Sequence, residues 1–419
     1  MGDAILTLDV EKATAGGRML ARHNGQIVLV WGAIPGERVR ARIERTAKGV
    51  LFAETVEVVS PSADRRDGGS GDWRCGGSVL AHVQYSRQLQ LKAEIIADAF
   101  VRIARMPLQS MPPVMASPEQ GYRMRARLHV RGLRIGFVRE GSHDVCPVAP
   151  TGQLLPETTA WIDAAETMLR AGGVRGLVSM EIAENVAATE RCCHLELEPG
   201  TKPSAFAPLA STGLTGLSAQ VLDRRAGAVL AGVPSVTDLI GSLRLTRDAR
   251  AFFQGNRFLL DALVERVSGL VTDGPVVDLY AGVGLFGLSL AATRGTQVTL
   301  VEGDAISGRD LEVNARPHAA HTQVVRASVE DFLRRHHASA NATFIVDPPR
   351  TGMSSEAVEG VVRAKPARIV YVSCDVATLA RDARLLTEGG YPLADISAAD
   401  LFPNTAHVET ICVFTRASH

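Results

Sequence analysis

The sequence predicts an α/β protein with three parts. We expect a small OB-like β-barrel over residues 1–60, a central β-rich α+β domain over residues 61–240, and a doubly wound, Rossmann-like domain over residues 241–419. Short apolar runs at regular spacing before residue 60 are typical of a small barrel. After residue 252, compact strands alternate with helical stretches, which is typical of a parallel sheet covered on both faces.

Composition excludes several classes of protein. The chain has 45 Lys plus Arg and 45 Asp plus Glu, so it is not a uniformly basic nucleic-acid-binding protein, although a local basic groove stays possible. No apolar run reaches the roughly 18 residues of a membrane helix, and the first residues lack the plan of a signal peptide. Six cysteines in 419 residues are too few for a disulfide scaffold. We therefore expect a cytoplasmic protein without membrane contact.

The middle of the chain contains one clear helix pattern and one basic strand. Apolar residues at helical spacing predict a helix over residues 86–105. Residues 122–139 contain six arginines and no acidic residue. Over residues 122–131 basic and apolar side chains alternate, and this period of two predicts a strand with one apolar and one basic face. A merely solvated face would mix charge signs, so we favour an RNA backbone as partner for this one. The arginines proposed to contact RNA are Arg123, Arg125, Arg127 and Arg131, with Arg38, Arg40, Arg42 and Arg45 of the barrel as a second contact.

A glycine turn opens the C-terminal domain. The buried strand at residues 276–279 leads into Gly282, Gly284 and Gly287, which spell G-x-G-x-x-G, and then into a helix. Glu302 ends the next strand, where an acidic side chain can bind both hydroxyls of a ribose. NAD and S-adenosylmethionine both contain that ribose, so this pair of features does not choose between them. The alternative is that the glycines only allow close packing of the helix on the strand.

The next strands each end in a residue whose side chain can bind a ligand or take part in a reaction. Asp347, Pro348, Pro349 and Arg350 follow an apolar strand; proline cannot donate to a sheet, so this stretch predicts a rigid platform that presents a carboxylate to a flat heterocycle. Cys374 lies where a strand changes into a helix, a position that favours a thiolate. The alternative for Cys374 is a buried, inert thiol.

Glu409 stands inside an apolar, strand-like run beyond Cys374. An acid in such a run is costly unless it is paired or functional, and the alternative is a salt-bridged residue on an edge strand. Together with Cys374 it fits one reaction. Uracil C5 is too weakly nucleophilic to take a methyl group directly, but a thiolate that adds at C6 activates it. A base must then remove the C5 proton so that the thiolate can leave.

These motifs resemble those of the S-adenosylmethionine-dependent RNA 5-methyluridine (uracil-C5) methyltransferases. The resemblance covers nearly the whole chain and is densest in FFQGN, DLYAGVG, VDPPRTG, VSCDVATLARD and FPNTAHVET. The first 60 residues resemble the TRAM barrel of the larger members, which act on ribosomal RNA. The resemblance implies Cys374 as nucleophile, Glu409 as base and a monomeric enzyme. It implies S-adenosylmethionine contacts for Gln254, Tyr280, Gly282, Gly284, Glu302 and Asp347, and substrate contacts for Pro348, Pro349 and Arg350.

The chain departs from this family at several positions. Larger relatives hold a four-iron four-sulfur cluster with four cysteines, and here only Cys75 and Cys146 remain, with Gly69 and Ser78 at the other places. We therefore expect no cluster, and two reduced thiols that lie close together. Asp375 follows the nucleophile where the family has Asn, and an inward-pointing carboxylate there would oppose thiolate formation. Leu285 replaces an Asn of the glycine turn, which removes one ligand contact.

Three alternatives remain open at this point. The substrate is expected to be 23S ribosomal RNA, with the tRNA T-loop as alternative because smaller tRNA-directed relatives also lack a cluster. A catalytically weakened RNA-binding homologue is a second alternative, and an NAD-dependent oxidoreductase is a third. His336 and His337 have no partners at zinc spacing, so we expect no metal site.

Overall fold

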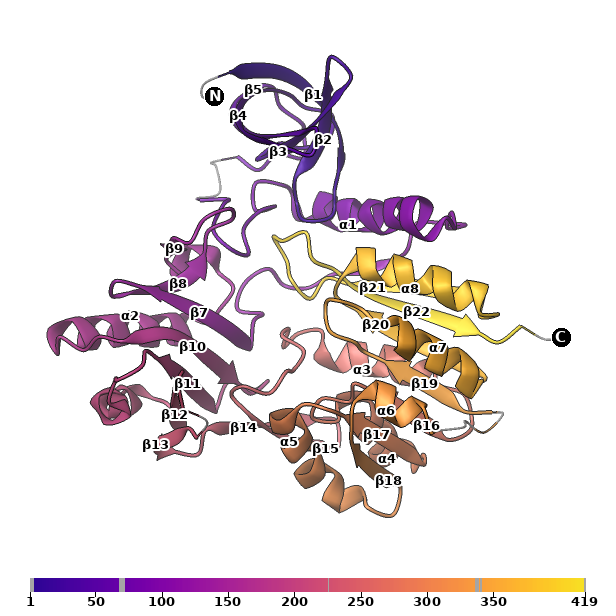
Figure 1. Cartoon of the computed structure of the whole chain (residues 1–419). Helices are drawn as coiled ribbons and strands as arrows, with labels where there is room; N and C mark the ends of the chain where they lie inside the picture. The colour runs from indigo at the N-terminus through magenta and orange to yellow at the C-terminus, as the bar shows by residue number, and fades with distance from the viewer. Residues whose placement is uncertain (1–3, 68–71, 225, 336–338, 340, 418–419) are drawn as a thin grey trace.

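The computed structural model describes residues 4–67, 72–224, 226–335, 339 and 341–417. Three bodies are visible in Figure 1: a barrel at the top, a sheet with one long helix on the left, and a sheet flanked by helices on the right. This arrangement confirms the predicted fold class. Gly69, His336 and His337 lie outside the described residues. Among the described residues, no helix combines the length and the apolar character that crossing a bilayer requires.

The N-terminal body is a closed five-stranded barrel in the order β1-β2-β3-β5-β4. Side chains alternate between its interior and solvent, most clearly along β4, so the apolar half of each strand fills the barrel. Its strands are β1 Ile5–Ala13, β2 Met19–His23, β3 Gln26–Trp31, β4 Arg38–Ala47 and β5 Val50–Ser60.

The central body is a seven-stranded sheet in the order β13-β12-β11-β10-β7-β8-β9. Helix α2 (Pro156–Ala171) packs Trp161, Ile162, Ala165 and Leu169 into the sheet's core cluster. The strands are β7 Arg125–Arg131, β8 Arg134–Val138, β9 Val145–Cys146, β10 Leu177–Glu184, β11 Arg191–Leu197, β12 Gly216–Val221 and β13 Ala228–Gly232. Two 3-10 turns, η2 Ala149–Thr151 and η3 Pro203–Thr212, and a separate hairpin of β14 Ser235–Ile240 and β15 Leu243–Asp248 complete this part.

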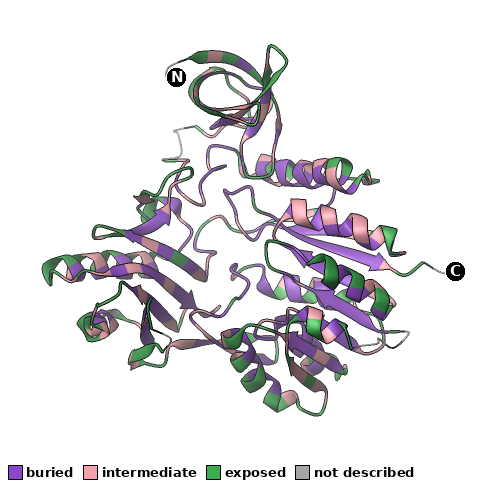
Figure 2. Cartoon of the chain, in the orientation of Figure 1, coloured by how far each residue is buried: buried purple, intermediate pink, exposed green. Residues whose placement is uncertain are grey.

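The C-terminal body is an eight-stranded sheet in the order β18-β17-β16-β19-β20-β22-β21-β6. Its interior strands are almost fully buried (Figure 2). All strands are parallel except β22, which pairs antiparallel with both neighbours. The strands are β6 Val114–Met115, β16 Val276–Leu279, β17 Val298–Glu302, β18 Thr322–Arg326, β19 Thr343–Val346, β20 Arg368–Ser373, β21 Leu393–Ala399 and β22 Glu409–Thr415.

Helices cover both faces of this sheet, as a doubly wound fold requires. Helices α6, α7 and α8 pack their buried residues into one core cluster, on one face of the sheet. Helices α3, α4 and α5 pack theirs into a second cluster, on the other face. Successive strand residues alternate between the two clusters: Val277 and Leu279 join the first, and Val276 joins the second. The helices are α3 Leu260–Gly269, α4 Leu285–Arg294, α5 Ala305–Ala315, α6 Val329–Leu333, α7 Ser355–Ala364 and α8 Val376–Glu388, with a 3-10 turn η4 Arg316–His318.

Helix α1 (Tyr85–Ala99) with its π-helical end η1 (Phe100–Ala104) lies between the barrel and the C-terminal sheet (Figure 1). Leu91 and Ile95 pack into the barrel cluster, whereas Ile96 and Phe100 pack into a core cluster of the C-terminal sheet. Strand β6 also joins that sheet from within the range assigned to the central domain. The domain boundaries stay predictions; the one at residue 240 falls in the turn of the β14–β15 hairpin.

Candidate active site

One edge of the C-terminal sheet brings the predicted catalytic residues together. The carboxyl ends of β16, β17, β19 and β20 meet there because these strands are parallel. Cys374 directly follows β20, and Glu409 begins β22, which runs in the opposite direction. Ser373 pairs with Thr410, so the next position on each strand places Cys374 beside Glu409.

Cys374 is a half-buried free thiol between β20 and α8. Burial, and to a smaller extent the negative charge of Glu409, raise its pKa to about 12, although the Arg350 guanidinium lowers it. The thiol is therefore protonated at neutral pH before any substrate enters. Thiolate formation needs a change in this environment, and Arg350 is the cation placed to assist it.

Asp375 is the N-cap residue of α8. Its Oδ1 accepts hydrogen bonds from the backbone nitrogens of Ala377 at 3.1 Å and Thr378 at 2.9 Å. The carboxylate is thus held at the helix N-terminus, where the helix dipole favours it. It still raises the pKa of Cys374, but less than Glu409 does. Asp375 therefore has a structural role, because its side chain caps the N-terminus of α8.

Glu409 is 1% exposed, and its Oε1 has no hydrogen-bond partner among the described residues. Burial raises its pKa well above the ordinary range; Asp347 raises it further, and Arg350 lowers it. Strand β22 lies between β20 and β21, so the alternative of a salt-bridged glutamate on an edge strand is wrong. A buried carboxyl group with an unused oxygen beside a thiol is typical of a catalytic acid or base.

The glycine turn between β16 and α4 is held by carboxylates. Gly282 N donates to Glu302 Oε2 at 2.7 Å, and Gly287 N donates to Asp278 Oδ2 at 2.8 Å. Gly284, with φ of 103°, is the N-cap of α4, and a Cβ on Gly287 would come within 2.5 Å of Leu300. The turn thus needs glycine for conformation at one position and for close packing at another.

These hydrogen bonds argue against a dinucleotide site. A pyrophosphate binds to free amide groups at a helix N-terminus, but here two amides of the turn already donate to acidic side chains. Leu285, the first residue of α4, is buried and belongs to the apolar core cluster on this face of the sheet. The oxidoreductase alternative therefore loses the feature that motivated it.

Three carboxyl groups gather around the turn. Burial, with smaller contributions from the charges of Asp347 and Glu302, raises the pKa of Asp278 to about 8. Burial also raises the pKa of Glu302 and brings that of Asp347 to about 7. Oδ1 of Asp278 has no partner among the described residues. Such a cluster favours a cationic ligand and repels phosphates.

Asp278 was missed by the sequence interpretation. The signal was present, because an acidic residue stands in the otherwise apolar strand Val276–Leu279. The surroundings of Asp278 could not be predicted, because they are formed by Gly287, Glu302 and Asp347, which lie in other parts of the chain.

The platform lies where the sequence predicts it. Strand β19 ends at Val346; Pro348 is buried, and Pro349 and Arg350 are exposed. Gln254 is buried, and its Nε2 donates to Asp347 Oδ2 at 3.1 Å, so it lies beside this platform. Tyr280 occupies a left-handed conformation with φ of 62°, which is uncommon for a residue other than glycine and marks a constrained turn at the same edge.

Comparison with known proteins gives the family. The model of the tRNA (uracil-5-)-methyltransferase family matches residues 244–417, and that of the TRAM domain matches residues 4–56. The 23S rRNA (uracil(1939)-C(5))-methyltransferase of Pseudomonas putida is 30% identical over 97% of this chain and 93% of its own length. An RNA methyltransferase of Nitratidesulfovibrio vulgaris is 31% identical over 98% of this chain and 96% of its own length.

The chain belongs to the RNA uracil-C5 methyltransferase family. Its enzyme class is therefore that of S-adenosylmethionine-dependent RNA (uracil-C5)-methyltransferases, with an N-terminal TRAM domain. Its fold matches the structure of Pyrococcus abyssi tRNA (uracil-54, C5)-methyltransferase in complex with S-adenosyl-L-homocysteine. The TM-score is 0.78 at 24% identity, over 98% of this chain and 99% of the other.

The arginine row of this methyltransferase differs from the predicted basic face. Strand β7 shows the expected alternation, but acidic residues of β10 and β11 neutralise its outer side. Arg125 forms an ion pair with Glu181, and Arg127 with Glu196 at 2.6 Å. The expectation of a uniformly basic face is wrong, because acidic residues distant in sequence lie on neighbouring strands.

Two other arginines of the row have different surroundings. Arg123 precedes β7; its Nη1 donates to Gln153 Oε1 at 2.7 Å, and its guanidinium lies 5.9 Å from the ring centroid of Phe402. Arg131 is exposed, and its Nε donates to the His143 backbone oxygen at 3.1 Å. In the barrel, Arg40 and Arg42 likewise pair with glutamates, and the Arg45 guanidinium lies 3.7 Å from the Phe52 ring centroid.

Cys75 and Cys146 form a disulfide, so the expectation of two reduced thiols is wrong. A disulfide has no thiolate to ligate iron, and Ser78 offers only a hydroxyl. The residues present therefore do not fit the four-cysteine pattern of a cluster. No group of three or more His, Cys, Asp or Glu side chains within the described ranges is placed to hold a metal ion.

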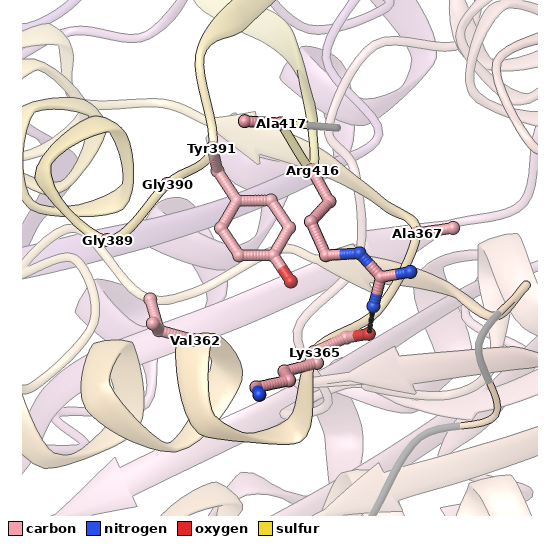
Figure 3. A pocket seen from close by; sticks show the side chains of 8 residues that line it. All are labelled: Val362, Lys365, Ala367, Gly389, Gly390, Tyr391, Arg416 and Ala417. Atoms are coloured by element: carbon pink, nitrogen blue, oxygen red, sulfur yellow. Dashed lines mark hydrogen bonds between the residues drawn. The ribbon is translucent and has the colours of Figure 1, made fainter. Parts of the chain in front are cut away.

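Cavities of this methyltransferase lie on both edges of the C-terminal sheet. One of about 450 Å³ is lined by Tyr280, Pro349 and Arg381 and opens beside the platform. Another of about 510 Å³ is lined by Lys365, Tyr391 and Arg416 (Figure 3). The residues that line the second cavity lie at the C-termini of α7 and α8 and just after β22. This cavity is therefore at the edge opposite Cys374 and takes no part in the candidate site.

Proposed function

We propose that this enzyme methylates C5 of a uridine in 23S ribosomal RNA, with Cys374 as nucleophile and Glu409 as base. The observation that carries the proposal is the position of Cys374 beside a buried Glu409 with a free oxygen, at the edge where Asp347 and the glycine turn also lie. The Pseudomonas relative, which matches 97% of the chain including the barrel, supports ribosomal RNA as the substrate. The tRNA T-loop is the alternative.

The residues divide the reaction between them. Sγ of Cys374 loses its proton and forms a bond to uracil C6, which makes C5 nucleophilic. S-adenosylmethionine, when bound, supplies the methyl group as a sulfonium that C5 can attack. Glu409 then takes the proton from C5, and the bond between Sγ and C6 breaks. Arg350 lowers the pKa of both Cys374 and Glu409, so it favours the anionic form that each step needs.

The cofactor contacts proposed here lie around the three carboxyl groups of Asp278, Glu302 and Asp347. Glu302 would bind the ribose hydroxyls, and Gly282 and Gly284 allow the backbone to approach the ligand. Asp347, Gln254 and Tyr280 line the same edge, with Asp278 as the additional acid. The unpartnered Asp278 Oδ1 and the raised pKa values of these acids fit a ligand that carries positive charge.

The RNA contacts proposed here need an exchange of partners. Arg131 is exposed and accessible to a phosphate group. Arg123 is half-buried, and its guanidinium must first leave Gln153 Oε1 and the Arg125 backbone oxygen, to which it donates. Arg125 and Arg127 contact RNA only if phosphates replace Glu181 and Glu196. Such exchange keeps the unbound face neutral, in agreement with a net charge of zero.

Transfer of labelled methyl groups to separately purified, unmodified ribosomal RNA and tRNA tests the substrate. We expect 5-methyluridine in 23S ribosomal RNA on nucleoside analysis. Its appearance only in tRNA would establish the T-loop alternative. Binding of S-adenosylhomocysteine without methylation of either pool would support the weakened homologue.

RNA that contains 5-fluorouracil tests the nucleophile. Fluorine at C5 leaves no proton for Glu409 to remove, so a covalent adduct with Cys374 should accumulate and be detected by denaturing electrophoresis. Cys374→Ala should form no adduct, and Cys412→Ala, a buried thiol of β22, should still form it. An adduct that persists in Cys374→Ala would contradict the assignment.

A further inference from the structure

A disulfide joins the segment after the barrel to the central sheet. Cys75 is bonded to Cys146, the last residue of β9, across 71 positions of sequence. The backbone nitrogen of Gly76 also donates to the Val138 oxygen at 3.1 Å. The disulfide thus adds a covalent bond to a joint that a second backbone hydrogen bond, from Glu140 N to the Arg74 oxygen at 2.7 Å, and the Arg139–Asp72 ion pair also hold.

Gln153 connects this joint to Arg123. Gln153 is 1% exposed; its Nε2 donates to the Gly76 oxygen at 3.0 Å, and its Oε1 accepts from Arg123 Nη1 at 2.7 Å. The Arg123 guanidinium in turn faces the ring of Phe402. Because both ends of the Gln153 amide are engaged, a displacement of Gly76 changes the position of Arg123.

A second connection leads from the same segment to the base. The backbone nitrogen of Leu80 donates to the Asn404 oxygen at 2.8 Å, and Asn404 is buried. Asn404 belongs to the loop over residues 400–408, which directly precedes Glu409. The segment that carries Cys75 therefore contacts the loop that positions Glu409.

A cavity gives access to the disulfide. Cys75 and Cys146 are 4% and 5% exposed, but both line a cavity of about 530 Å³ that is also lined by Asn404. A small dithiol can reach the sulfurs through this cavity, which extends between the disulfide and the 400–408 loop.

We propose that Cys75–Cys146 is a thiol–disulfide exchange site that controls how firmly Arg123 and the 400–408 loop are held for RNA. The proposal rests on the function proposed above for the loop and for Glu409. With the disulfide closed, the joint is rigid and RNA binds to a preorganised surface. With it open, the 72–83 segment moves more freely, and RNA affinity falls.

The chemistry is a balanced exchange with a dithiol. A thiolate of the dithiol attacks one sulfur of the pair and forms a mixed disulfide, and the other cysteine leaves as a thiolate that takes up a proton. The second thiol of the dithiol then attacks its own mixed disulfide. The dithiol ends as a disulfide, and Cys75 and Cys146 each end as a thiol.

Kinetics of the full-length enzyme in both redox states test this proposal. Alkylation of denatured protein should modify four cysteines before reduction, namely Cys192, Cys193, Cys374 and Cys412, and all six after it. We expect reduction by dithiothreitol to raise KM for RNA and to lower kcat/KM about fivefold or more. The Kd for S-adenosylhomocysteine should change less than the Kd for RNA, because the nearest proposed cofactor contact, Gln254, meets the joint only through the backbone hydrogen bond from Met124 N to the Gly255 oxygen. RNA affinity is measured in parallel on both forms.

Variants separate this site from general thiol effects. Cys75→Ser/Cys146→Ser should behave as the reduced enzyme with or without dithiothreitol, and Cys192→Ala should keep the response of the wild type. If the double variant fails to fold, the wild-type comparison decides alone. Equal RNA affinity of the verified oxidised and reduced forms would overturn the proposal, as would six modified cysteines before reduction. Absence of methyl transfer in both forms would instead count against the proposed function, and RNA affinity would still test the exchange site.

Discussion

Arg350 acts on both proposed catalytic groups, Cys374 and Glu409, from one position in the platform. It lowers the pKa of Cys374 and of Glu409, while burial and neighbouring acids raise both. Asp278, Glu302 and Asp347 form a second set of acids whose pKa values burial raises. At the residue scale, the site therefore holds groups in their neutral forms until cationic partners arrive.

Replacement of Arg350 should move the pH dependence of methylation. Without the guanidinium, the anionic forms of Cys374 and Glu409 become less favourable, so the rising limb of kcat/KM in Arg350→Gln should shift upward by up to about one pH unit. The measurement is kcat/KM for RNA between roughly pH 6 and 10. Arg334→Gln, which removes an exposed arginine paired with Asp331 and Glu356, is the control. An unshifted limb in Arg350→Gln would refute this role.

Binding of S-adenosylmethionine should release protons near pH 7. The carboxyl groups of Asp347 and Asp278 have pKa values raised to about 7 and about 8, so both are partly protonated there. A bound cation stabilises their anionic forms, lowers their pKa values and expels protons. Calorimetry in two buffers of different ionisation enthalpy measures the release. S-adenosylhomocysteine, which lacks the sulfonium charge, should release fewer; equal release by both ligands would contradict the cluster's proposed role.

Helix α1 determines the position of the 400–408 loop at the element scale. Lys92, fully buried on this helix, forms an ion pair with the buried Asp400 and donates to the Phe402 oxygen at 3.0 Å. One turn earlier, Gln88 Nε2 donates to Asn404 Oδ1 at 2.9 Å. Spacing of four residues places both side chains on one helix face. An element that precedes the central sheet in sequence thus supports the loop before Glu409.

Loss of the Lys92 charge should destabilise the fold. Lys92→Met leaves Asp400 buried without its partner, which should lower the free energy of unfolding by about 3–5 kcal/mol. Urea denaturation followed by circular dichroism measures the change. Lys12→Met, which removes the partly exposed pair of Lys12 with Asp98, should cost less than about 1 kcal/mol, because Asp98 keeps its ion pair with Arg102. A comparable cost for both variants would show that the buried pair has no special role.

Charge on the whole molecule is balanced locally as well as in total. Acidic side chains of β10 and β11 pair with Arg125 and Arg127, and those of the barrel pair with Arg40 and Arg42. Arg131 stands apart from these pairs at the end of β7, where it donates to a backbone oxygen. The RNA binding proposed for these arginines would then depend on the few that are accessible and on partner exchange at the others.

Salt dependence of RNA binding should distinguish the two kinds of arginine. Arg131→Gln should reduce the slope of log K against log salt concentration by about 1, because an accessible phosphate contact is lost. Arg127→Gln should change the slope less, since the wild-type arginine must first leave Glu196. Filter binding at several salt concentrations gives both slopes. A larger change for Arg127→Gln would place the RNA path over β10 and β11 instead.

The sequence alone determined the barrel, the doubly wound sheet, and the meeting of Cys374, Glu409, Asp347 and the glycine turn. Such features depend on local patterns and on one rule of topology, because the carboxyl ends of parallel strands share an edge. Tertiary structure alone decided the ion pairs of the arginine row, the disulfide and the Lys92–Asp400 pair. Each joins residues far apart in sequence, and no periodicity records which distant side chain a charge or a thiol will meet.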